Sequence, residues 1–203
     1  MHEHVAIRRL ASIAAPGESA RSILLRRGSR LEDLADVLPV VSAKTPCSLE
    51  EILDGTFRPR DSANPPYREG RFSDGTFGVY YSALEEETCK AEVAYHLQKD
   101  IDDPDPRSYS MIECRYEGRT ANLLGKEGQH PQLVGSMEAA WSFCQDLGRE
   151  AVERGVDGFL TASARRPGGT CVPVFTREAL SDPQVGNSYR MTIRAGRVQY
   201  RVV

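Results

Sequence analysis

The chain has 203 residues, 40% of them apolar, which is enough for one globular domain with an elaborated end or a small accessory segment. Its 26 basic and 29 acidic residues give a net charge of −3, which argues against a nucleic-acid binder but leaves a local basic patch open. No stretch approaches the ~20 apolar residues that a membrane span needs, and no signal-peptide core follows Arg8 and Arg9. We therefore expect a cytoplasmic protein with no direct contact to nucleic acid or membrane.

The five cysteines are widely spaced, odd in number and free of any CxxC pair. Such a pattern disfavours both a disulfide framework and a zinc knuckle. We expect reduced, buried thiols and no bound metal.

Residues 1–55 have the pattern of a polar helical segment. Apolar residues recur at helical spacing over 31–38. Ser48-Leu-Glu-Glu51 matches the S-x-x-E pattern of a capping box and predicts that a short helix begins there. Because no evident chemistry lies in this region, we expect a helical accessory segment over 1–55, followed by a domain over 56–203.

The middle of the chain begins with an irregular stretch. Three prolines, an asparagine and a glycine over 58–70 predict a loop. The apolar and aromatic run at 77–82 predicts a short strand. Ser82-Ala-Leu-Glu85 is a second S-x-x-E pattern, and it predicts a helix that extends to about Gln98.

The second half of the chain mixes strands and helices without a regular β-α-β alternation. The pattern predicts one long helix over 137–154. It also predicts four strands, at 108–116, 120–124, 157–162 and 170–176, and a closing hairpin over 189–203. This mixture indicates an α+β fold in which mixed sheets are flanked by helices. No Walker or GxGxxG sequence is present to hold a phosphate group.

One polar face of the helix that follows Glu85 stands out. Glu92 and His96 are four residues apart and share this face. The face borders the apolar stripe of the helix, so we expect Glu92 to be partly buried and paired with an arginine. The alternative is a solvated Glu–His pair, since charged residues on helices usually face water.

Three blocks carry most of the unusual polar residues: GRFSDGTFGVYYS, the helical AEV, and DGFLTASAR. In this order and spacing they resemble the RES domain, a family named for its arginine, glutamate and serine. The matching positions here are Arg71, Glu92 and Ser163, and Tyr81 matches the strand tyrosine of the family. The resemblance covers roughly residues 57–175.

The resemblance implies an ADP-ribosyltransferase-like fold and NAD⁺ as the substrate. RES proteins act as toxins that degrade NAD⁺ by hydrolysis or phosphorolysis, and a cognate Xre-like antitoxin covers the active site. The family thereby implies a toxin that cleaves the nicotinamide–ribose bond. A protein ADP-ribosyltransferase and a non-catalytic NAD-binding module are the alternatives. The oligomeric state stays open, a homo-oligomer included.

The matching residues suit this chemistry. Cleavage of the bond builds positive charge on the sugar, and Glu92 would stabilise that charge or activate the attacking oxygen. Arg71 would hold the pyrophosphate or a phosphate nucleophile; its alternative is an ion pair with Glu92 or Asp74. Ser163 would bond the ribose or the nicotinamide amide, or would only cap the end of a strand.

Aromatic and basic residues complete the expected NAD⁺ site. Tyr81 and Tyr80 are both candidates for stacking, but neighbouring strand residues alternate between faces, so only one should face the ligand. Arg165 matches an arginine that often follows the family's serine. The family also has an arginine upstream of the GR block, for a second phosphate contact. Its candidates here are Arg60, which we favour, Arg58 and Arg68.

Overall fold

The computed structural model of the protein describes residues 2–11, 48–60, 66–99, 107–135, 141–194 and 196–203. In chain order the elements are β1 (His2–Ala11), α3 (Leu49–Phe57), β2 (Tyr80–Ala83), α4 (Glu86–Lys99), β3 (Arg107–Asn122), the 3₁₀ turn η2 (Pro131–Leu133), α5 (Trp141–Glu153), β4 (Gly158–Ala162), β5 (Thr170–Val174), the 3₁₀ turn η4 (Arg177–Ala179), β6 (Leu180–Arg194) and β7 (Arg197–Val202).

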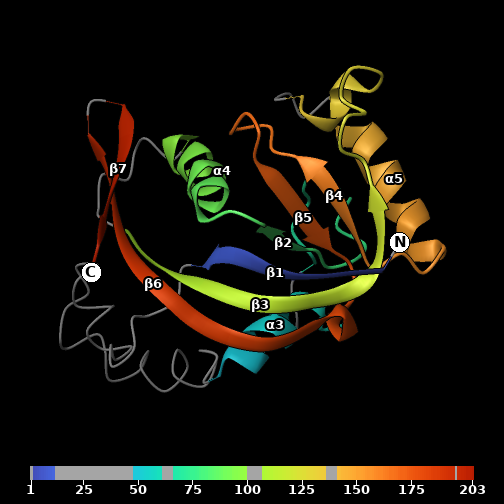
Figure 1. The fold of residues 1–203 in the computed structure, drawn as a ribbon, viewed down its shortest axis with the longest axis horizontal. Coiled ribbons are helices and arrows are strands. Elements are labelled where there is room, and N and C mark those ends of the chain that lie inside the picture. The colour runs from blue at the N-terminus through green and yellow to red at the C-terminus, as the bar shows by residue number, and fades with distance from the viewer. Residues whose placement is uncertain (1, 12–47, 61–65, 100–106, 136–140, 195) are drawn as a thin grey trace.

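The strands form one seven-stranded mixed sheet in the order β1-β2-β5-β4-β3-β6-β7. Only β3 and β4 are parallel; the other pairs are antiparallel. An additional pairing of β1 with β3 closes five of the strands into a ring. β3 and β6 are long and curved, and the hairpin of β6 and β7 stands at one end of the sheet (Figure 1). The α+β class expected from the sequence is confirmed.

Each of the three helices in the described residues covers its own part of the apolar core. α4 and α3 lie on opposite sides of the long strands β3 and β6, and α5 packs beside β4 (Figure 1). Neighbouring residues of β3 divide between the clusters: Met111 packs in the cluster that includes α4, and Ile112 packs in the cluster that includes α3. A third, phenylalanine-rich cluster lies under α5. Because successive side chains of β3 point to opposite faces of the sheet, α4 and α3 pack on opposite faces.

The N-terminal expectation of helices is wrong for residues 2–11 and correct for the short helix that follows Ser48. His2–Ala11 is a strand, and ten of its residues pair with β3. Ile7 is completely buried in the core, so a long-range pairing overrides the local helical pattern. The helix expected over 31–38 lies outside the described residues. The capping box is confirmed, because the Ser48 side chain accepts from the Glu51 N–H and the Glu51 carboxylate accepts from the Ser48 N–H.

Two element boundaries in the middle of the chain also differ from expectation. The strands expected on either side of Gly118 are one continuous strand, because β1 pairs with β3 through this glycine. The helix expected to begin at Ser82 begins at Glu86. Ser82 is a strand residue whose hydroxyl donates to the Val172 carbonyl oxygen, so it cannot cap the helix. Glu85 takes the position before the helix instead, and the Thr88 and Cys89 N–H groups donate to its carbonyl oxygen.

The remaining C-terminal elements are confirmed in kind, but β6 begins at Leu180, nine residues before the expected hairpin, and residues 137–140 of the expected helix lie outside the described residues. α5 stops before Gly155, which has a φ of 66°, a conformation that suits glycine. β4 and β5 lie on either side of the loop that contains Ser163, and β6 and β7 form the closing hairpin. Four of the five cysteines lie in described residues and are free thiols. No helix in the described ranges is long and apolar enough to cross a membrane.

Two helical glycines give a paired test of how closely α5 approaches the loop that contains Phe72. A Cβ on Gly148 would lie 2.0 Å from the Phe72 carbonyl oxygen, whereas a Cβ on Gly55 of α3 would meet nothing within 4 Å. We predict that Gly148→Ala lowers the free energy of unfolding by about 1–3 kcal/mol through overpacking. Gly55→Ala should raise it by roughly 0.5–1 kcal/mol through helix propensity. Urea unfolding followed by circular dichroism measures both, and equal stabilisation by the two variants would contradict the close packing of α5.

Candidate active site

Glu92 and Ser163 meet across the space between α4 and the loop after β4. The Ser163 hydroxyl donates to Glu92 Oε1 at 2.7 Å. The Cys171 thiol, at the start of β5, approaches the same oxygen at 3.6 Å. Within the described part of the chain Glu92 has no ion pair, so the arginine partner expected from the sequence is replaced by a hydroxyl and a thiol. Glu92 is half-buried, as expected, and His96 is exposed.

Ser163 organises its loop as well as the carboxylate. Its hydroxyl oxygen accepts from the Arg165 N–H at 3.1 Å and from the Arg166 N–H at 3.0 Å. Its own N–H donates to the Gly169 carbonyl oxygen at 2.8 Å. A serine hydroxyl has one proton and two acceptor lone pairs, so these contacts use all of them. Ser163 therefore positions Glu92 and closes the loop, and has no hydrogen bond to spare for a ligand in this arrangement.

Tyr81 presents its ring on the sheet face that carries Cys171. Tyr81 lies opposite Pro173 on β5, and Cys171 lies opposite Ala83, so all four side chains leave the sheet on one side. The Tyr81 residue is 38% exposed, but its hydroxyl is enclosed and accepts from the Phe72 N–H at 3.0 Å. Burial raises the pKa of Tyr81 to about 12. The neutral phenol is thus held at its tip while the ring remains open to a stacking partner.

Tyr80 is not part of this surface, although we had included it among the candidate ligand contacts. It is completely buried in the core, and its hydroxyl lies 3.6 Å from Cys114 Sγ. The Arg9 guanidinium lies over its ring, 4.8 Å from the centroid. The alternation of β2 places Tyr80 and Tyr81 on opposite faces, so only Tyr81 can reach a ligand from this strand.

Arg71 is held by backbone carbonyls and pairs with neither Glu92 nor Asp74. Nη1 donates to the carbonyl oxygens of Gln132 and Leu133 at 3.1 Å each, and Nη2 donates to that of Gly135 at 2.8 Å. A guanidinium has five N–H donors, so two remain beyond these three bonds among the described residues.

Arg71 remains electrostatically close to Tyr81, because its positive charge acts to lower the pKa of that phenol against the larger effect of burial. Asp74, the other partner considered for Arg71, pairs instead with Arg149 at 2.7 Å. The hydrogen bonds from Arg149 and Thr76 lower the pKa of Asp74 to about 2. The charge of Arg71 therefore lies beside the tyrosine with no carboxylate paired to it in the described residues.

Two further arginines are stacked on tyrosine rings. The Arg165 guanidinium carbon lies 3.4 Å from the centroid of Tyr95. The Arg60 guanidinium lies 4.5 Å from the centroid of Tyr67, and its Nη2 donates to the Gly55 carbonyl oxygen. Nε of both arginines is buried without a hydrogen-bond partner in the described ranges. Arg165 shares the loop of Ser163 and lies at the site, whereas Arg60 follows the C-terminal end of α3.

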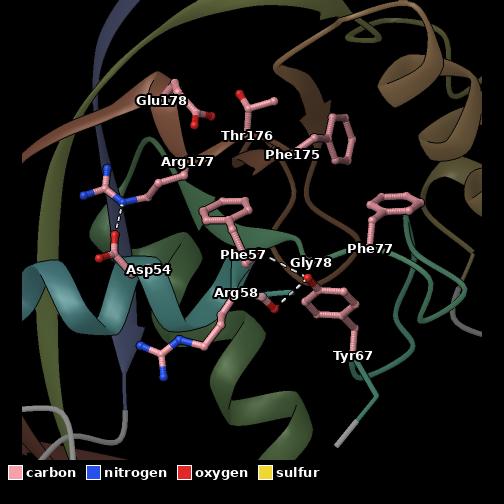
Figure 2. A pocket seen from close by; sticks show the side chains of 10 residues that line it. All are labelled: Asp54, Phe57, Arg58, Tyr67, Phe77, Gly78, Phe175, Thr176, Arg177 and Glu178. Atoms are coloured by element: carbon pink, nitrogen blue, oxygen red, sulfur yellow. Dashed lines mark hydrogen bonds and ion pairs between the residues drawn. The ribbon is translucent and has the colours of Figure 1, made fainter. Parts of the chain in front are cut away.

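The hollows in the surface do not coincide with these residues. One pocket of about 380 Å³ lies between α3 and the end of β5 and is lined by aromatic rings, among them Phe57, Tyr67 and Phe77 (Figure 2). A second, of about 250 Å³, lies between α4 and β7. Neither pocket is lined by Arg71, Tyr81, Glu92 or Ser163. We assign the candidate site to the open sheet face, because a carboxylate oriented by a hydroxyl is a stronger indication of a reactive site than a shallow pocket.

Cys171 was missed in the sequence, where the cysteines were interpreted only as buried thiols. Burial, and next the negative charge of Glu92, raise the pKa of the thiol. The thiol therefore stays protonated and donates toward the carboxylate. The signal that could have revealed it is the return of β5 beside β4, which places Cys171 opposite Thr161, two residues before Ser163.

Comparison with known proteins now identifies the family. The model of the RES domain family matches residues 48–194, from the N-cap of α3 to the end of β6. This chain belongs to the RES domain family. The match to this RES domain is longer at both ends than the resemblance noted in the sequence.

Other comparisons of this RES domain are less informative. A similar solved structure is described as the crystal structure of the M. tuberculosis MbcT-MbcA toxin-antitoxin complex. It is 14% identical, with a TM-score of 0.47, over 94% of this chain and 86% of that chain. No curated protein matches.

The central position of Ser163 yields a stability prediction. Ser163→Ala removes the hydroxyl and leaves the Arg165 and Arg166 N–H groups and the Glu92 carboxylate without it. Because unsatisfied polar groups are costly when sheltered, we expect the free energy of unfolding to fall by about 1–3 kcal/mol. Ser142→Ala, at an exposed position of α5, should change it by less than ~0.5 kcal/mol. Parallel urea titrations compare the two, and an equally small effect would contradict the positioning role of Ser163.

Proposed function

We propose that this RES domain cleaves the nicotinamide–ribose bond of NAD⁺. The observation that carries the proposal is the Glu92 carboxylate, held at 2.7 Å by the Ser163 hydroxyl beside the open ring of Tyr81. A fixed, unpaired carboxylate next to an aromatic platform suits a planar ligand that develops positive charge. Family membership supports the same substrate, because all three residues for which the family is named are present.

Glu92 has the geometry to stabilise the sugar cation. Both hydrogen bonds from Ser163 and Cys171 go to Oε1, and among the described residues no bond to Oε2 occurs. Oε2 would face the ribose C1′ as the bond to the nicotinamide nitrogen breaks and the electron pair leaves with the ring. A water or phosphate oxygen then bonds to C1′. With water, its proton passes to the carboxylate or to solvent, and the products are nicotinamide and ADP-ribose.

The neighbouring residues would bind the rest of the dinucleotide. The Tyr81 ring would stack on the nicotinamide or the adenine. The two uncommitted N–H groups of Arg71 would take a pyrophosphate or phosphate oxygen. Arg165, stacked on Tyr95 with Nε unsatisfied, would supply further phosphate contacts. Arg60, with a second buried and unpartnered Nε, is our candidate for the upstream arginine of the family.

We further propose that the protein acts as the toxin of a toxin–antitoxin pair in the cytoplasm, where it would deplete NAD⁺. Membership of the RES domain family supports this role. The partner would be an Xre-like antitoxin that covers the open sheet face around Tyr81 and Glu92. Tyr81 on this face is exposed, so a partner could contact it there.

The deciding experiment is to identify the products from NAD⁺. Purified protein is incubated with NAD⁺, with and without phosphate, and nicotinamide and the ADP-ribose product are quantified by chromatography. Free ADP-ribose in both buffers indicates hydrolysis, and a phosphorylated ADP-ribose only with phosphate indicates phosphorolysis. Labelled ADP-ribose on protein would favour a protein ADP-ribosyltransferase. Binding by calorimetry with intact NAD⁺ would overturn the enzymatic proposal in favour of a binding module.

The role of Glu92 yields a catalytic prediction. Glu92→Gln keeps the size of the side chain and its hydrogen bond to Ser163 but removes the negative charge. We expect kcat to fall by roughly 10²–10⁴-fold, the usual contribution of a positioned carboxylate. Glu153→Gln, at an exposed position of α5, is the control that removes the same charge, and it should retain activity. A fully active Glu92→Gln variant would exclude the assigned role.

The role of Tyr81 yields a separate prediction on binding. Tyr81→Ala removes the ring and should raise KM for NAD⁺ by roughly 5–100-fold, the range expected for loss of one stacked ring at about 1–3 kcal/mol. Tyr81→Phe keeps the ring and loses only the oxygen that accepts from the Phe72 N–H, so its KM should stay close to that of the native protein. Steady-state kinetics separate the two, and an unchanged KM for Tyr81→Ala would contradict stacking.

A further inference from the structure

Four exposed arginines lie on one face of the β6–β7 hairpin. Arg190 of β6 is directly opposite Arg201 of β7, and Arg194 is directly opposite Arg197. Arg190 and Arg194 are four residues apart on one strand, so all four side chains leave the ribbon on the same side. Met191, between them, is buried in the cluster under α4. The arginines therefore face away from α4.

None of these four arginines has a hydrogen bond or ion pair within the described part of the chain. Other exposed arginines of the protein do have partners, such as Arg154 with Glu150 at 2.6 Å. The position between the two arginine pairs holds Thr192 and Gln199, which also face each other. The face thus concentrates positive charge with no acidic residue on either strand between the two pairs, in a chain whose net charge is −3.

A purely structural role does not account for the whole of this pattern. Charged residues on an edge strand prevent pairing with other sheets, which would explain Arg197 and Arg201 on β7. Arg190 of β6 pairs with Ser108 of β3 and so is not at an edge, and only Arg194 lies beyond the described pairing with β3. Like charges placed directly across a ladder destabilise it. Repulsion between the paired arginines therefore destabilises the hairpin, and a bound anionic ligand would neutralise that repulsion.

The hairpin also has the shape of a projecting ribbon. β3 begins at Arg107, which pairs with Met191 of β6. Among the described residues, β3 therefore does not pair with the part of β6 between Met191 and the hairpin tip. The tip beyond Met191 is a two-stranded ribbon at the end of the sheet (Figure 1). The two arginine pairs are separated by four residues, or about 13 Å along the strand. B-form DNA has a major groove about 12 Å wide that admits such a ribbon.

We propose that this arginine face of the β6–β7 hairpin binds the phosphate backbone of double-stranded DNA. Each of the four arginines would hold one phosphate by bidentate hydrogen bonds, and the two cross-strand pairs would contact the backbones on the two sides of a groove. Such contacts position a protein on DNA without sequence specificity. The surface is separate from the Glu92 site, so it does not depend on the proposed NAD⁺ chemistry.

The test uses the full chain and a fluorescent DNA duplex of ~20 base pairs, followed by anisotropy at several salt concentrations. Four phosphate contacts predict a slope of log K against log salt of about −3.6, which is roughly a hundredfold loss of affinity between ~50 and ~200 mM salt. Arg190→Ala with Arg194→Ala should weaken binding about tenfold or more at low salt and reduce the slope by about 1.8. Arg197→Ala with Arg201→Ala should do the same.

The matched control is Arg115→Ala with Arg154→Ala, which removes the same charge from arginines that have carboxylate partners. It should leave affinity and slope nearly unchanged, and all variants should unfold at similar urea concentrations. The proposal is overturned if the native chain shows no salt-dependent binding, or if the control pair weakens it equally. It is also overturned if a glutamate-rich peptide binds through the four arginines while DNA does not. If the β7 double variant self-associates and the β6 double variant binds DNA normally, the proposal is also overturned, because the arginines would then serve only to protect the edge strand.

Discussion

The continuous pairing of β3 with three other strands is the constraint on which the rest of the structure depends. β3 pairs with β6 on one edge, and with β1 and then, in parallel, with β4 on the other. The parallel pairing directs β4 so that Ser163 emerges immediately beyond its end. The same strand presents Met111 to α4, which carries Glu92. Two residues that are 71 positions apart in sequence can therefore meet at 2.7 Å.

The electrostatic character of the site follows from what surrounds Glu92. An arginine in direct contact would neutralise the carboxylate and reduce its attraction for a developing sugar cation. The described structure instead provides the neutral hydroxyl of Ser163 and the neutral thiol of Cys171, which orient the carboxylate without cancelling its charge. The charge of Arg71 is held by three backbone carbonyls and is not paired with Glu92. Separation of the two charges is what suits the site to a ligand with a cationic ring and an anionic pyrophosphate.

The sequence predicted features that depend on neighbouring residues and failed where distant strands decide. The capping box at Ser48, the helix end before Gly155 and the alternation of Tyr80 and Tyr81 are local, and all three are confirmed. The strand β1 was missed because it exists through pairing with residues about a hundred positions away. Continuity of β3 through Gly118 has the same origin.

The candidate site could be predicted to a similar extent. The blocks around Glu92 and Ser163 identified two residues that do meet, because the family motif records a contact that periodicity alone cannot reveal. The partners of Arg71 could not be foreseen, since they are carbonyls of a 3₁₀ turn some sixty residues later. Ser163 was expected to contact ligand, but the saturation of its hydroxyl is visible only once the loop folds back on it. The sequence thus predicted which residues form the candidate site, but it did not predict which of them would contact a ligand and which would orient other side chains.

Helix α4 connects the two surfaces to which we assign functions. Glu92 lies on its side toward β5, and Lys90, two residues earlier, points away toward the hairpin. Lys90 is buried between the rings of Tyr189 and Tyr200, at 4.5 and 4.6 Å from their centroids, and it pairs with Glu86 and Glu87 on its own helix.

The hairpin thereby fixes the position of α4. The Tyr189 and Tyr200 hydroxyls donate to the carboxylates of Glu86 and Glu87. Two hydrogen bonds and a buried cation between aromatic rings hold the helix where Glu92 reaches Ser163. The side of the hairpin that packs on α4 sets the geometry of the carboxylate, and the opposite side carries the four arginines. The hairpin that carries the arginine face is therefore also the support of the helix that carries Glu92.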